Sequence, residues 1–255
     1  MTTGVLLYCF DTPNTAYHKL ALKSIDLIKK NLNLPITVVT DNDTHRHFSQ
    51  FLGVTYILIK HQTKNYRYYR GQNIPWYNME RANAYNHSFY DTTLLLDCDY
   101  LCYTNDLLEL CNSNYDFLLH NSVHDITGKN RILKKLESTL PIVWATVVMF
   151  KKTEKAKQIF EMIQHVQQNY DHFRNLYRIK HKNYRNDYAF AIALHQLQGQ
   201  ITTPMFIPSP MNMLPHEYDV LEITDDSVIY KYDKKINMIQ DTDVHVLDKD
   251  FVNVR

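Results

Sequence analysis

The chain has 255 residues, a formal net charge of +1 at pH 7 and four cysteines. Its length allows a sizeable core, and we expect a single α/β domain over residues 1–255. A net charge so near zero excludes an overall electrostatic field that would attract a polyanion, although local basic patches are still possible. The sequence has no Cys-x-x-Cys spacing, signal sequence or apolar run long enough for a bilayer. We therefore expect a cytoplasmic protein with reduced thiols and no membrane span.

The first hundred residues alternate predicted strands with a predicted helix. Apolar runs predict strands at residues 5–10, 35–40 and 54–60. Between the first two, apolar residues recur at helical spacing from Ala21 to Leu32, which predicts an amphipathic helix. This alternation predicts a doubly wound parallel sheet that binds its ligand at the carboxyl ends of the strands. The absence of Gly-x-Gly-x-x-Gly and Walker sequences disfavours ordinary dinucleotide and P-loop proteins.

Two carboxylates follow the most apolar predicted strand, at residues 93–96. These are Asp97 and Asp99, and if the strand continues through Asp99 both side chains point to the same side. A divalent cation held there can bridge the phosphates of a nucleotide-activated donor and neutralise the departing diphosphate. The alternative is that the two carboxylates end a buried strand and accept hydrogen bonds from loop amides.

The second half of the chain is less regular. Residues 115–120 and 143–151 read as strands, and 154–170 read as a helix with one apolar face. Asn186 is placed to cap a further helix, and strand-like runs follow at 227–230 and 244–247. No internal repeat or linker divides the chain.

Residues 78–85, 90–101 and 106–110 resemble the centre of GT-A glycosyltransferases, most closely the glycogenin-like, retaining branch. In that family a helix with a cationic donor-binding residue leads into an apolar strand, the Asp-x-Asp motif and a short Asp-Leu-x-x-Leu helix. The resemblance implies a Rossmann-like GT-A domain with a mostly parallel central sheet flanked by helices. It also implies a glycosyltransferase that uses a nucleotide sugar, preferably a UDP-sugar, with Mn²⁺ or Mg²⁺. Residues 1–110 would form the nucleotide-binding half and residues 111–255 the acceptor half.

The resemblance also implies roles for individual residues. His245, from the predicted C-terminal strand, would complete a metal shell with Asp97 and Asp99, and two carboxylates with an imidazole suit manganese better than calcium. Asp187, at a helix start, would be the residue nearest the chemistry. The donor would be bound by Tyr8, Tyr17, Asp41, Asn78, Arg81, Asp97 and Lys249.

Each of these roles has a structural alternative. The helix dipole stabilises Asp187 whatever its function, and a lone strand histidine such as His245 is usually part of a core or a surface. Lys249 follows at a shorter spacing than in the family and without its glycine. Residues 144–150 lack the Asn-x-Gly that usually lines the sugar pocket, which leaves the sugar and the stereochemistry open.

Two stretches, 64–70 and 173–185, interleave basic and aromatic residues. Lys and Arg neutralise phosphates and Tyr stacks on bases, so this pattern suggests a nucleic-acid acceptor. The specific hypothesis is a phage-type enzyme that glycosylates a hydroxymethylated pyrimidine flipped out of double-stranded DNA, working in the host cytoplasm. The candidate DNA-binding residues are Arg67, Arg70, Arg178 and Lys180. A solvated basic loop is the alternative, with a saccharide, lipid-linked or protein hydroxyl as the acceptor.

Two rival functions remain. A nucleotidyltransferase also places carboxylates on such a sheet, but it uses a Gly-rich, Lys-Arg signature near its first strand that is absent here. A non-catalytic protein that binds nucleotide sugars or DNA would keep the fold and lose the chemistry. Hydrolysis of the donor in the presence of manganese would distinguish the enzyme from the binding protein.

Overall fold

The computed structural model describes residues 1–48, 53–60, 66–69, 72–130, 140, 143–198 and 205–253, with only the backbone described at 67–69 and 72–75. A six-stranded sheet forms its centre, in the order β3-β2-β1-β6-β10-β8. Its strands are β1 (Thr3–Tyr8), β2 (Ile36–Thr40), β3 (Val54–Leu58), β6 (Thr92–Asp97), β8 (Phe117–His120) and β10 (Trp144–Lys151).

This sheet is mostly parallel, as the sequence predicts. Strands β1, β2, β3 and β6 run parallel, and Tyr8 pairs with Asp97 at the carboxyl ends of β1 and β6. Strand β10 is the exception, because it is antiparallel to both β6 and β8. Buried strands in either direction have continuous apolar sequences, so the residues 143–151 contain no local signal of their direction.

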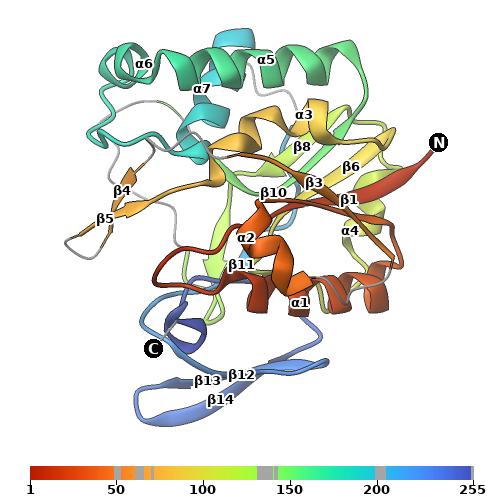
Figure 1. Ribbon diagram of the computed structural model, residues 1–255, viewed down its shortest axis with the longest axis vertical. Helices are drawn as coiled ribbons and strands as arrows, with labels where there is room; N and C mark the ends of the chain where they lie inside the picture. The colour runs from red at the N-terminus through yellow and green to blue at the C-terminus, as the bar shows by residue number, and fades with distance from the viewer. Residues whose placement is uncertain are drawn as a thin grey trace.

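Helices cover both faces of the sheet (Figure 1). One face carries α5 (Glu154–Gln168), α6 (Tyr170–Leu176) and α7 (Asn186–Gln198), with the short helices η3 (Asn78–Asn83) and α3 (Ala84–His87) beside them. The other face carries α1 (Tyr17–Leu27), which continues as η1 (Ile28–Leu32), and α4 (Leu107–Asn112). Two short helices follow β2: α2 (Asn42–His45) and η2 (Arg46–Phe48).

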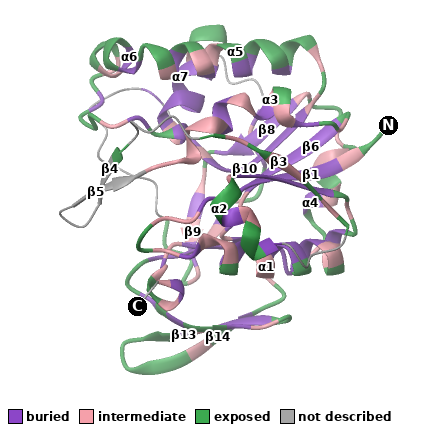
Figure 2. Ribbon diagram, in the orientation of Figure 1, coloured by how far each residue is buried: buried purple, intermediate pink, exposed green. Residues whose placement is uncertain are grey.

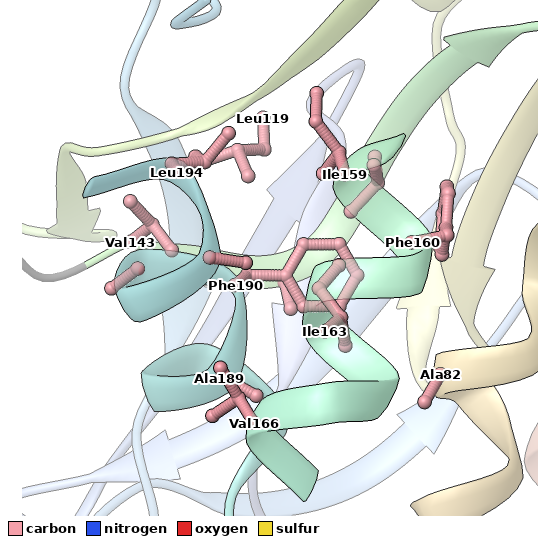
Figure 3. Close-up of a cluster of buried hydrophobic side chains, with 14 of the residues drawn as sticks. Ala82, Leu119, Val143, Ile159, Phe160, Ile163, Val166, Ala189, Phe190 and Leu194 are labelled. Carbon is pink, nitrogen blue, oxygen red and sulfur yellow. The ribbon is translucent and has the colours of Figure 1, made fainter. Parts of the chain in front are cut away.

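The predicted apolar face of α5 forms much of one core. Ile159, Phe160 and Ile163 are at most 1 % exposed and lie in one buried cluster with Phe190 of α7 (Figure 3). The rings of Phe160 and Phe190 lie edge to face with their centroids 5.9 Å apart, an arrangement that aromatic pairs favour. Thr153 caps α5 by accepting a hydrogen bond from the Ala156 N–H. Buried residues therefore line both sides of the sheet, and exposed ones lie on the outer faces of the helices (Figure 2).

Smaller sheets extend the domain. A four-stranded sheet has the order β7-β15-β11-β9, and a three-stranded sheet has the order β12-β13-β14. Their strands are β7 (Tyr100–Leu101), β9 (Val123–Asp125), β11 (Met211–Leu214), β12 (Asp219–Ile223), β13 (Ser227–Tyr232), β14 (Lys235–Gln240) and β15 (Val244–Val246). The remaining elements are the hairpin β4 (Tyr66–Tyr69) and β5 (Gln72–Pro75), and the short helix η4 (Asp250–Val252). No helix within the described ranges is long and apolar enough to cross a membrane.

Candidate active site

The two predicted carboxylates meet at the end of β6, but a turn rather than a continuous strand brings them together. Strand β6 ends at Asp97, Cys98 and Asp99 form a turn, and β7 starts at Tyr100. The expected alternation along one strand is therefore wrong. The turn still brings the two side chains close together: ligand atoms of Asp97, Asp99 and His245 all lie within 4.8 Å of one another.

His245 reaches this turn through strand pairing. Strand β15 runs antiparallel to β7, with His245 opposite Tyr100, and the Val246 N–H donates a 3.0 Å hydrogen bond to the Asp99 carbonyl. The His245 Nε2 atom lies 3.2 Å from Asp99 Oδ1, and its Nδ1 atom lies 3.3 Å from the Thr146 hydroxyl. The buried imidazole is thus held on both nitrogens, which fixes the orientation of its ring.

Lys249 lies against the same carboxylate. Its Nζ atom is 2.7 Å from Asp99 Oδ2 and also donates to the Val246 carbonyl. Burial by itself raises the pKa of Asp99, but the charges of Lys249 and His245 outweigh it and hold that pKa below its usual range. Burial lowers the pKa of Lys249, but the Asp99 charge, the nearby Tyr17 and the hydrogen bond to Asp99 together outweigh that effect and raise the pKa. Asp99 and Lys249 are therefore both charged at neutral pH.

The side chain of Arg81 is buried and paired with Asp97. It is 1 % exposed, and one guanidinium nitrogen donates to Asp97 Oδ1 over 2.8 Å. The guanidinium also donates to backbone carbonyls of both central strands, namely Leu95 and Leu96 of β6 and Ala145 and Thr146 of β10. A guanidinium enclosed in this way contacts Asp97 and the sheet, and it does not face solvent where a diphosphate would enter. Its position supports a role in orienting Asp97.

The electrostatic environment of Asp97 differs from that of Asp99. Burial raises the pKa of the Asp97 carboxyl, the nearby Arg81 charge lowers it, and the Asp99 charge raises it again. The net effect is a pKa above the usual value of an aspartate. Two carboxylates at one site repel each other, and a cation between them relieves that repulsion. The fit to a divalent ion is good, because two carboxylates and one imidazole are the ligand types that Mn²⁺ accepts.

Asp187 lies at the amino end of α7, as predicted from the sequence. Its Oδ1 atom accepts a 3.0 Å hydrogen bond from the Ala145 N–H of β10, and its Oδ2 atom lies 3.3 Å from an Arg185 nitrogen. The Asp187 charge also raises the pKa of Asp97, so the two carboxylates share one polar site. The carboxylate remains 22 % exposed and is accessible to a bound molecule.

The other four residues predicted to bind the donor lie in different parts of the fold and have different contacts. The side chain of Tyr8 is 3 % exposed and hydrogen-bonded to His87 Nδ1 over 2.8 Å in the core, so a donor contact of Tyr8 stays a prediction. Tyr17 begins α1, is partly buried and interacts electrostatically with Lys249. Asp41 ends β2 and caps α2 by accepting from the Thr44 N–H over 2.7 Å, the structural role that its sequence also allows. Asn78 accepts a hydrogen bond from Asn186 through its backbone carbonyl.

Two residues beside this site were not among the site residues predicted from the sequence. Thr146 orients His245, and Asn186 links α7 to Asn78 through a 3.1 Å hydrogen bond. Within the described residues, the side-chain oxygens of Asn78 and Asn186 are buried without a hydrogen-bond partner. A buried acceptor without a donor is costly, so such atoms mark places where a ligand hydroxyl or a water can donate. The polar Thr146 in an apolar strand was the one available signal.

The candidate acceptor residues are only partly described. Arg178 and Lys180 are exposed on the segment that joins α6 to α7, which leads directly to Asp187. Arg67 lies in β4, where the backbone alone is described, and Arg70 lies outside the described residues. The segment with Arg178 and Lys180 adjoins Asp187 in sequence, and the DNA-binding role of both basic segments stays a prediction.

No protein-family model matches the sequence, and no curated protein sequence matches it as a relative. The fold is shared with the solved structure of mouse xyloside xylosyltransferase 1, with a TM-score of 0.51, 10 % identity, and coverage of 81 % of this chain and 84 % of that one. The chain is also similar to the galactosyltransferase LgtC in complex with donor and acceptor sugar analogues (TM-score 0.45, 15 % identity, coverage 76 % and 70 %).

A third similar structure is the glycosyltransferase GlyE of Streptococcus pneumoniae TIGR4 (TM-score 0.43, 13 % identity, coverage 81 % of this chain). This chain spans 44 % of the length of that protein. The fold is thus the mixed α/β fold of GT-A glycosyltransferases, with a mostly parallel central sheet flanked by helices, and the sequence-based prediction of that fold is confirmed.

Proposed function

We propose that the protein is a metal-dependent glycosyltransferase that moves a sugar from a nucleotide sugar, preferably a UDP-sugar, to an acceptor hydroxyl. The observation that carries this proposal is the convergence of Asp97, Asp99 and His245 beside Lys249, at the carboxyl ends of a GT-A sheet. Ligands of open α/β sheets bind at that edge. A nucleotide sugar presents there a diphosphate, which needs both a cation and a hydrogen-bond donor.

Asp97, Asp99 and His245 would hold Mn²⁺ or Mg²⁺, and the bound ion would neutralise the diphosphate. The residues themselves supply the rest of the leaving-group stabilisation. Lys249 has a raised pKa and therefore presents a full positive charge next to the ion site. Arg81 holds Asp97, and Thr146 holds His245, so neither ligand has to reorganise as the leaving group departs.

We assign the step at the sugar to Asp187. Its Oδ1 atom is held by the Ala145 N–H, which fixes the position of the carboxylate. The partly exposed carboxylate can then orient the acceptor hydroxyl or stabilise positive charge that develops on the sugar. The unpartnered side-chain oxygens of Asn78 and Asn186, close to it, fit hydroxyl donors on a sugar.

For the acceptor, we propose a hydroxymethylated pyrimidine of phage DNA, flipped out of the duplex to reach the donor. The support is the exposed basic segment with Arg178 and Lys180, which ends at Asp187. Phosphates bound along this segment would guide a base toward α7. A saccharide or a protein hydroxyl is the alternative acceptor, and an assay with both kinds of acceptor decides between them.

The donor reaction tests the first proposal without any knowledge of the acceptor. Metal-free protein is incubated with individual nucleotide sugars, with and without Mn²⁺, and release of the nucleoside diphosphate is measured. We expect manganese-dependent release from a UDP-sugar, and a loss of about 100-fold or more in Asp99→Asn. Asp106→Asn removes an exposed carboxylate a few residues away and should leave the rate unchanged. No release from any nucleotide sugar would favour a non-catalytic binding protein.

The acceptor assay uses the UDP-sugar found active in the donor reaction. Labelled sugar is supplied together with duplex DNA that contains hydroxymethylated pyrimidine, unmodified DNA, or oligosaccharides. We expect incorporation into the modified DNA alone, because ordinary cytosine and thymine offer no suitable hydroxyl. Incorporation into oligosaccharides alone would reject DNA as the acceptor and retain the glycosyltransferase.

A further inference from the structure

A second group of potential metal ligands lies outside the carboxylate site. Asp11 follows β1, His18 is in the first turn of α1, and His47 is in η2. One ligand atom of each residue lies within 4.8 Å of the other two. Within the described residues, this group and the Asp97 group are the two that meet this criterion. The proposed glycosyl transfer uses none of these three side chains.

The Asp11 carboxylate is the fixed centre of the group. Its Oδ1 atom accepts a 2.9 Å hydrogen bond from the His18 N–H, and the Asp11 N–H donates to the Thr44 hydroxyl over 2.9 Å. Its Oδ2 atom lies 2.6 Å from His18 Nδ1 and 3.9 Å from His47 Nε2. One carboxylate oxygen therefore faces a nitrogen of each imidazole, from two separate segments of the chain.

The two imidazoles are stacked, with ring centroids 4.1 Å apart and planes 9° from parallel. His18 is satisfied by the carboxylate, but His47 Nε2 at 3.9 Å is beyond hydrogen-bonding distance. Neighbouring ligand atoms around a tetrahedral Zn²⁺ lie about 3.3 Å apart, given metal–ligand bonds of about 2.0–2.1 Å. The distances from Asp11 Oδ2 to His18 Nδ1 (2.6 Å) and to His47 Nε2 (3.9 Å) lie on either side of that value. Two imidazoles and one carboxylate are also a ligand set that Zn²⁺ favours over Ca²⁺ or Mg²⁺.

We propose that Asp11, His18 and His47 form a second metal site, which binds a divalent transition ion such as Zn²⁺. A metal lies close to the plane of each imidazole that ligates it, so one stacked ring has to turn on binding. His47 can make this turn, since its side chain is 53 % exposed. The Asp11 carboxylate is held by the His18 N–H, and the His18 ring is held by that carboxylate. Three protein ligands leave a fourth position for water or another ligand.

The site would join the loop after β1 to η2, two segments that follow neighbouring parallel strands. It would also stiffen the start of α1, where Tyr17 interacts electrostatically with Lys249. The ion would thus brace the edge of the sheet beside the carboxylate site. This inference is independent of the proposed glycosyl transfer, because it rests on the ligand geometry alone.

The test measures Zn²⁺ binding to metal-free protein by calorimetry, with Asp99→Asn as the background so that the carboxylate site is weakened. We expect one tight equivalent of Zn²⁺ at the second site and an increase in Tm when it binds, because the ion links two segments of the native state. Replacement by Co²⁺ should give the intense visible absorption of a tetrahedral site. None of these readouts depends on enzyme activity.

His47→Ala, added to the Asp99→Asn background, should weaken Zn²⁺ binding by about 100-fold. Loss of an outer-shell partner already costs about 10–100-fold in metal affinity, and His47 would be a direct ligand. The matched control is His45→Ala, which removes a histidine from the adjacent α2 whose ring packs against Tyr56 instead. It should leave Zn²⁺ binding unchanged. The proposal is overturned if the Asp99→Asn protein binds no Zn²⁺, if binding survives His47→Ala, or if His45→Ala abolishes it as well. Unfolding in urea without metal verifies that both variants are folded.

Discussion

Arg81 donates a 2.8 Å hydrogen bond to Asp97 from a guanidinium that is 1 % exposed. The same guanidinium bonds to carbonyls of β6 and β10, so it joins the antiparallel strand to the parallel part of the sheet. A buried charge of this kind is tolerated only when it is paired and hydrogen-bonded. Arg81 therefore couples the stability of the sheet to the position of a proposed metal ligand.

Arg81→Lys should destabilise the protein strongly. A lysine cannot reproduce the forked guanidinium, so Asp97 and several buried carbonyls lose their donors, at a cost of about 3–5 kcal/mol in the free energy of unfolding. Urea unfolding measures the change. Arg174→Lys is the control, because Arg174 pairs with Asp171, whose side chain is 84 % exposed, and such surface pairs contribute about 0–1 kcal/mol. Similar losses in both variants would show that the buried network is unimportant.

Asp187→Asn should depress turnover and leave donor binding nearly unchanged. The amide oxygen of asparagine can still accept from the Ala145 N–H, so the side chain keeps its place while its charge is lost. We expect kcat to fall by about 10²–10³-fold at nearly constant donor KM, since the interaction matters mainly in the transition state. Steady-state kinetics with the active donor measure both parameters. A large rise in donor KM would place Asp187 on the donor side instead.

His120 should make stability depend on pH. The side chain is buried in β8, its Nδ1–H donates to the Ser209 carbonyl over 3.1 Å, and its Nε2 has no partner within the described residues. Burial lowers the pKa of His120 to about 4, below the value of about 6.5 expected in the unfolded chain. The unfolded state therefore binds the proton more tightly. The free energy of unfolding is therefore highest above about pH 6.5, and it falls as the pH decreases toward 4.

The size of this effect is about 3 kcal/mol over that range. Urea unfolding at a series of pH values measures it, and His120→Gln, which cannot titrate, should flatten the curve between pH 6.5 and 4. An equally steep loss of stability in His120→Gln would assign the effect to other groups.

Charge reversal on the segment between α6 and α7 tests the proposed DNA contact. Arg178→Glu combined with Lys180→Glu should weaken duplex DNA binding and reduce the salt dependence of log K by about 2, since two phosphate contacts are lost. Fluorescence anisotropy at several salt concentrations measures both quantities. The control is Lys231→Glu with Lys235→Glu, in the exposed β13–β14 hairpin at the opposite end of the molecule from α6 (Figure 1). Equal effects in both pairs would indicate non-specific attraction, and nucleotide-sugar binding should change in neither.

The sequence by itself determined the class of fold and the main strands and helices of the central sheet. Apolar runs indicate β1, β2, β3 and β6, and helical periodicity indicates α1 and the buried face of α5. These elements can be predicted because the spacing of buried apolar residues follows the period of the backbone within a short stretch of sequence. The Asp-x-Asp motif and its resemblance to GT-A enzymes then predicted where ligands bind. The direction of β10 in the sheet was not determined by the sequence, because this antiparallel strand has the same apolar pattern as a parallel one.

The tertiary structure decided which side chains meet, apart from the grouping of Asp97, Asp99 and His245 that the family resemblance implied. His245 joins Asp99 because β15 pairs with β7, and Asp11 meets His47 because β1 and β2 are neighbours, relationships between segments that are distant in sequence. Burial decided the rest. Arg81 and Tyr8 have sequences around them that suit a binding site, yet both side chains lie inside the protein, where Arg81 meets carbonyls of β10 and Tyr8 meets His87. A local pattern records the type of side chain, whereas its partners depend on how the whole chain packs.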